Sequence, residues 1–62
     1  MPAFSIDRAS GGFRAHFWGD NVPPKLIWWT EVYTREEHAQ HAIDLMKRHA
    51  ATAPVYNRAK AA

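Results

Sequence analysis

The feature that most constrains this chain is an alternation of apolar and polar side chains on both sides of a glycine-containing turn. Between Ala3 and Arg8, the apolar residues Phe4 and Ile6 alternate with the polar residues Ser5 and Asp7. A similar alternation occurs between residues 13 and 18. A period of two is typical of a strand with one buried face. Residues 9–12 contain two glycines able to form a tight turn, so the sequence predicts an antiparallel hairpin.

A third strand is predicted at residues 25–31, after a longer connection over residues 19–24. Pro23 and Pro24 lie in that connection, where they do not interrupt a ladder of backbone hydrogen bonds. Apolar side chains occupy both parities of this strand. That pattern predicts that both of its faces are covered to some extent.

A helix is predicted at residues 35–49. Thr34 and Glu37 have the spacing of a capping box, in which each side chain accepts from the other residue's backbone N–H. An apolar stripe at three- and four-residue spacing follows, built largely of small residues: Ala39, Ala42, Ile43, Met46 and Ala50. The chain is therefore predicted to be α+β, a three-stranded antiparallel β-meander packed on one C-terminal helix.

The chain beyond the helix is predicted to form a short extended segment and then a flexible tail. A residue that precedes proline avoids helical angles, which favours an extended course around Pro54. We expect Val55 and Tyr56 to anchor this segment, and residues 57–62 to be flexible because they hold no large apolar side chain. A single domain at residues 1–56 is the expected organisation.

Sixty-two residues provide only one small core, and such a core gives marginal stability. The chain has no cysteine, which excludes disulfides and cysteine-ligated metals as the reinforcement. Association with a second copy is the leading alternative. Two of the positive charges behind the net charge of +2 lie at Arg58 and Lys60, so the domain itself is near neutral. No apolar run is long enough for a membrane span, and a cytoplasmic location is expected.

The order of these features resembles the YegP-like family, a family of small bacterial, archaeal and phage proteins classed as a domain of unknown function. The resemblance extends from about Phe4 to Tyr56. It rests on Phe4-Ser5-Ile6, Gly11-Gly12-Phe13-Arg14, Asn21, Ile27, Thr30-Glu31-Val32-Tyr33, Ala39, Ala42-Ile43 and Lys47-Arg48-His49-Ala50. Family members often carry two copies of this unit, so the resemblance implies that a single copy pairs with a second chain. It implies no activity and no catalytic residues.

The residues themselves do not indicate an enzyme, a cofactor or a metal. His38 and His41 are about one helical turn apart, but the helix lacks the His-Glu-x-x-His spacing of a zinc protease. Paired carboxylates for acid–base catalysis are not found, because the acidic residues are scattered along the chain. We therefore expect a non-enzymatic protein with no cofactor and no metal.

The sheet face opposite the helix is the candidate interface. If Phe4 and Phe17 face inward, a mixed basic and aromatic set remains outside, drawn from Arg14, His16, Trp18 and one of Trp28 or Trp29. A monomer rarely exposes a large aromatic patch. In one hypothesis this face makes a homodimer or binds a protein partner, and the protein is a small scaffold. In the alternative, it is a stacking platform for nucleic acid.

Overall fold

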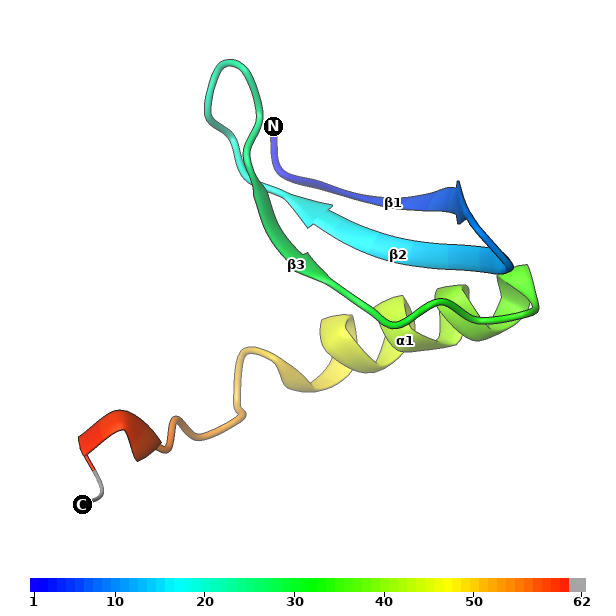
Figure 1. Ribbon diagram of the computed structural model, residues 1–62. Coiled ribbons are helices and arrows are strands. Elements are labelled where there is room, and N and C mark those ends of the chain that lie inside the picture. The colour runs from blue at the N-terminus through cyan, green and yellow to red at the C-terminus, as the bar shows by residue number, and fades with distance from the viewer. Residues whose placement is uncertain (61–62) are drawn as a thin grey trace.

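The computed structural model describes residues 1–60 and has the predicted α+β arrangement (Figure 1). Three antiparallel strands are followed by one helix. They are β1 (Ala3–Ala9), β2 (Gly12–Trp18), β3 (Leu26–Trp29) and α1 (Glu36–His49). The sheet has the order β1-β2-β3, so β1 and β3 are both edge strands. The predicted meander is confirmed.

The β1–β2 hairpin has the predicted turn and depends on two glycines with different roles. Gly11 adopts a φ of +89°, which side chains other than glycine rarely tolerate. Gly12 has an ordinary φ, but a Cβ atom there would collide with the backbone carbonyl of Tyr33. That close approach allows Phe13 and Tyr33 to exchange two backbone hydrogen bonds of 2.7 Å. The end of the hairpin is thereby tied to the chain that leads into α1.

The core is built where α1 lies close to β2. Ala15 on β2 and Ala39 on α1 are fully buried, and Ile43 is 5% exposed. The small side chains let helix and sheet approach, as the apolar stripe predicts. Around them pack partly buried larger residues: Phe4, Ile6, Phe13, Trp28 and Tyr33. The backbone of α1 lies close to β2 and β1 but not to β3, which reaches the core through the Trp28 side chain, so one edge of the sheet extends beyond the helix.

The third strand is shorter than the predicted 25–31 and less covered. Regular pairing with β2 is confined to Leu26–Trp29 and includes an irregularity opposite Phe17 and Trp18. After Trp29, the Thr30 hydroxyl accepts the Ala15 N–H at 3.1 Å, in place of a backbone carbonyl. Ile27 and Trp29 are 59% and 56% exposed, so the chain itself covers only one face of β3, and cover of the other face by a second copy stays a prediction.

The helix begins one residue later than predicted, and the capping box is not formed. The N-cap is Arg35, which has extended backbone angles and makes no capping hydrogen bond with its side chain. Because the bonds to Phe13 hold Tyr33 in the sheet, the chain needs both Thr34 and Arg35 to turn away. Glu37 instead accepts a 3.3 Å hydrogen bond from the Arg35 guanidinium.

The segment after α1 leads away from the rest of the molecule (Figure 1). Val55 is 91% exposed and Tyr56 is 75% exposed, so the predicted anchoring is wrong within one chain. Extended backbone around Pro54 passes into a single 3-10 turn at Arg58–Lys60. The predicted flexible tail at 57–62 also includes residues 61 and 62, which lie outside the described residues. Among residues 1–60, no helix has both the length and the apolar character that crossing a membrane requires.

Candidate functional site

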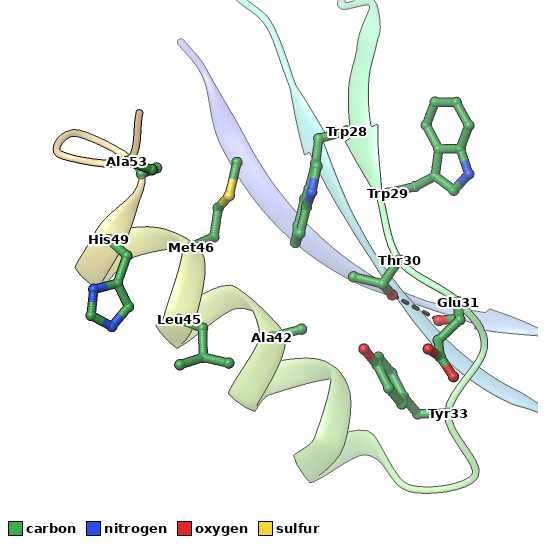
Figure 2. A pocket seen from close by; sticks show the side chains of 11 residues that line it. Trp28, Trp29, Thr30, Glu31, Tyr33, Ala42, Leu45, Met46, His49 and Ala53 are labelled. Carbon is green, nitrogen blue, oxygen red and sulfur yellow. Dashed lines mark hydrogen bonds between the residues drawn. The ribbon is translucent and has the colours of Figure 1, made fainter. Parts of the chain in front are cut away.

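An apolar groove runs between β3 and the C-terminal half of α1. It has a volume of about 520 Å³ and is open to solvent along its length. Its lining is mainly aliphatic and aromatic: Trp28, Trp29, Thr30, Glu31, Tyr33, Ala42, Leu45, Met46, His49, Ala50 and Ala53. Figure 2 shows Trp28 projecting from the strand toward the helix, with Met46 on the opposite side. The groove is the space left because the backbone of α1 lies over β2 and β1 and not over β3.

Trp28 forms the wall of the groove that is continuous with the core. Its ring meets the ring of Phe4 edge-on at 6.0 Å, and Phe4 in turn packs against Phe17 at 4.7 Å. Trp28 pairs with Phe17 across β2 and β3, which places all three rings on the helix side of the sheet. One side of the Trp28 indole thus packs against the core. The rest of the groove is not covered by any other part of residues 1–60.

The outer face of the sheet, opposite α1, carries a hydrogen-bonded chain of side chains. The Trp18 indole N–H donates to the Ser5 hydroxyl at 2.9 Å, and Ser5 donates to Asp7 Oδ2 at 2.7 Å. His16 Nδ1 lies 2.7 Å from the same carboxylate oxygen. Because an ionised carboxylate only accepts, Nδ1 carries the hydrogen. These bonds hold the rings of His16 and Trp18 at 5.7 Å from each other.

The Ser5 hydrogen bond lowers the pKa of Asp7 below its ordinary value of 3.8, and the hydrogen bond and charge of His16 lower it further. Both interactions favour the carboxylate over the carboxylic acid. Asp7 is therefore ionised throughout the neutral range, and it keeps the two aromatic rings in place there.

Arg14 stands directly opposite Asp7 in the β1–β2 register, yet the two make no salt bridge. The carboxylate of Asp7 is engaged by Ser5 and His16 instead. Within residues 1–60, Arg14 forms no ion pair with any acidic residue, and its buried Nε has no hydrogen-bond partner. The outer face thus combines ordered aromatic rings with a guanidinium that has no acidic partner.

The structure brings four of the five candidate interface residues to the outer face and separates the fifth. Arg14, His16 and Trp18 lie on β2 at alternating positions, and Trp29 pairs with His16 from β3. Trp29 is also among the residues that line the groove, but Figure 2 shows its ring pointing away from it. Trp28 lies on the helix side and lines the groove, so the two neighbouring indoles serve different surfaces.

Ala42 and Met46 of the groove belong to the predicted stripe of the helix, whereas Leu45 and His49 escaped the sequence prediction. Leu45 is 41% exposed and lies beside the predicted stripe, next to Met46. Periodicity identifies the buried line of a helix, but not how far an adjacent strand extends beyond that line. Leu45 and His49 lie next to the predicted apolar stripe, and including them in it would have predicted the helix side of the groove.

The helix histidines do not form a metal centre in the part of the chain that the structure describes. Among residues 1–60, no three side chains of His, Cys, Asp or Glu come together. His38 instead meets the ring of Tyr33 edge-on at 6.3 Å.

Comparison with protein families finds one described as Domain of unknown function (DUF1508), which matches residues 24–57. That span is more than half of the chain. The chain belongs to this family. The resemblance to YegP-like proteins is thereby confirmed. The matched span contains β3, α1 and the exposed segment after it, the parts that form and adjoin the groove. Comparison with curated proteins finds no match, and comparison with solved structures finds none.

Proposed function

We propose that this DUF1508 protein is a small non-enzymatic interaction protein that works as a homodimer, with each copy covering the groove of the other. The observation that carries this proposal is that one chain has both an open apolar groove and a segment with largely exposed apolar side chains. Trp28 and Met46 line the first, and Val55 and Tyr56 belong to the second. Each copy supplies what the other lacks.

The size of the exposed surface supports association. A compact monomer of 7.1 kDa exposes about 4,100 Å². This chain exposes 5301 Å². Its radius of gyration is 13.6 Å, against about 11 Å for a compact chain of this length. The excess surface exceeds the roughly 800 Å² that each partner buries in a standard interface.

The geometry of the chain end supports a reciprocal exchange of residues 54–57. Ala53 lines the groove of its own chain, so the segment departs from the groove's rim. A two-fold axis near that rim brings each segment over the partner's groove. β3 is an edge strand there and can accept an added strand on its free side. Pro54 lacks a backbone N–H, and a strand that is paired on one side only can accommodate such a residue.

Size-exclusion chromatography with light scattering tests the dimer. The wild-type chain is expected at about twice 7.1 kDa, because removing the apolar segment and the groove from water drives association. Tyr56→Ser should shift the protein toward 7.1 kDa, with a loss of about 2 kcal/mol or more in dimerisation. Leu45→Glu should do the same from the groove side, since Leu45 is too exposed for the change to unfold a monomer.

Val22→Ser is the matched control for these variants. Val22 is 98% exposed and lies in the connection between β2 and β3. The dimer mass should not change. A monomeric wild type, or an equal effect of Val22→Ser and Tyr56→Ser, contradicts the proposal.

This arrangement leaves the outer face of the sheet free. A protein partner or nucleic acid can meet the dimer there, and a cytoplasmic location remains part of the proposal.

A further inference from the structure

We propose that the outer face of the sheet binds single-stranded nucleic acid, with bases stacking on Trp29, His16 and Trp18 and a phosphate on Arg14. This inference goes beyond the dimer and does not depend on it, because the groove and the outer face lie on opposite sides of the sheet. Four observations carry it.

The first is an aromatic row of the kind on which bases stack. His16 and Trp18 follow each other on one face of β2, and Trp29 pairs with His16 from β3. Trp29 is 56% exposed. Proteins that bind single strands without strong sequence preference use such rows, because every base offers a flat face.

The second is that two of these rings are already held in place. Ser5 fixes the indole of Trp18, and Asp7 fixes the imidazole of His16. A ring whose position is set before binding loses little conformational entropy when a base stacks on it. The hydrogen bonds run along the sheet from β2 to β1, so they order the rings without involving the core.

The third is the free charge of Arg14. Asp7, the residue directly opposite in register, accepts hydrogen bonds from Ser5 and His16 on Oδ2 and makes no salt bridge with Arg14. A guanidinium without an acidic partner beside an aromatic row suits a ligand that carries both anionic and flat groups. A nucleic-acid strand has both at each nucleotide.

The fourth is that the site lies on the face of a sheet, which should disfavour a duplex. The sheet face offers stacking surfaces but no helix or ribbon that would enter a groove of double-stranded DNA. Stacking needs unpaired bases, so single strands should be preferred.

Fluorescence anisotropy of a labelled oligothymidylate of about ten nucleotides tests the proposal, with a duplex of the same length beside it. The full chain should bind the single strand at about 50 mM salt and weaken at about 200 mM. Trp29→Ala should weaken binding roughly tenfold, because one stacked base is lost. Arg14→Gln should weaken it several-fold and reduce the dependence on salt.

Arg48→Gln is the control for charge. It removes one positive charge from the exposed last turn of α1, away from the outer face, and should leave binding nearly unchanged. Light scattering of Trp29→Ala should still give the mass of the wild type. The proposal is wrong if the single strand does not bind at the lower salt concentration. It is equally wrong if the duplex binds as well, if Arg48→Gln matches Arg14→Gln, or if Trp29→Ala changes the mass.

Discussion

Asp7 is the residue whose surroundings organise the outer face. One of its carboxylate oxygens accepts hydrogen bonds from Ser5 and from His16, and through Ser5 it also fixes Trp18. A carboxylate in such a position has a lowered pKa in the folded state. Its contribution to stability is then present above the unfolded-state pKa of about 3.9 and is lost as the pH falls through the folded-state value.

Ser5→Ala should raise the pKa of Asp7 back toward 3.8, because the Ser5 hydrogen bond is the largest cause of the shift. A carboxyl carbon titration followed by NMR measures the change directly. Ser10→Ala, in the exposed hairpin turn, should leave the Asp7 pKa where it is. An Asp7 pKa that does not respond to Ser5→Ala would show that this hydrogen bond does not form.

At this scale, the sequence predicted the faces of β1 and β2 but not the faces of the two tryptophans. Parity works for Phe4, Ile6, Arg14 and His16 because the first hairpin keeps its register throughout. Parity could not tell which of Trp28 and Trp29 faces the helix, because both parities of β3 are apolar. The pairing of Trp28 with Phe17 determines which tryptophan faces the helix. That pairing depends on an irregularity in β3 that no single residue predicts.

The start of α1 shows how tertiary contacts can override a local signal. Thr34 and Glu37 have the right spacing for a capping box, but the bonds between Phe13 and Tyr33 keep the chain extended past Thr34. The helix therefore begins at Glu36, with Arg35 at a position where serine or aspartate would cap. The existence and length of the helix were predictable from its stripe, while its first residue was not.

Arg35→Asp should stabilise the protein by about 1 kcal/mol, because an aspartate at the N-cap accepts a backbone N–H and complements the helix dipole. The exposed pair between Arg35 and Glu37 is lost, at a cost of a few tenths of a kcal/mol. Urea unfolding at fixed protein concentration measures the difference. Thr34→Ala is the comparison and should change little. The account of the N-cap is contradicted if Thr34→Ala lowers the free energy of unfolding by about 1 kcal/mol and Arg35→Asp does not raise it. That result would indicate that Thr34 caps the helix.

At the scale of the whole molecule, the chain is larger and more open than its length requires. Its core is centred on two alanines and one isoleucine, while Leu26, Ile27, Leu45 and Tyr56 remain exposed. Length and composition led to the expectation that a second copy associates. They could not predict the groove that we propose it covers, because the groove exists only through the offset between α1 and β3.

The most direct test of the paired molecule is an isotope-filtered NOE experiment on an equal mixture of labelled and unlabelled chains. Reciprocal exchange predicts contacts between the Tyr56 ring of one copy and Met46 or Trp28 of the other, because these residues line the groove that the segment would fill. Contacts of Tyr56 confined to its own chain, or no contact with the groove at all, would contradict the account.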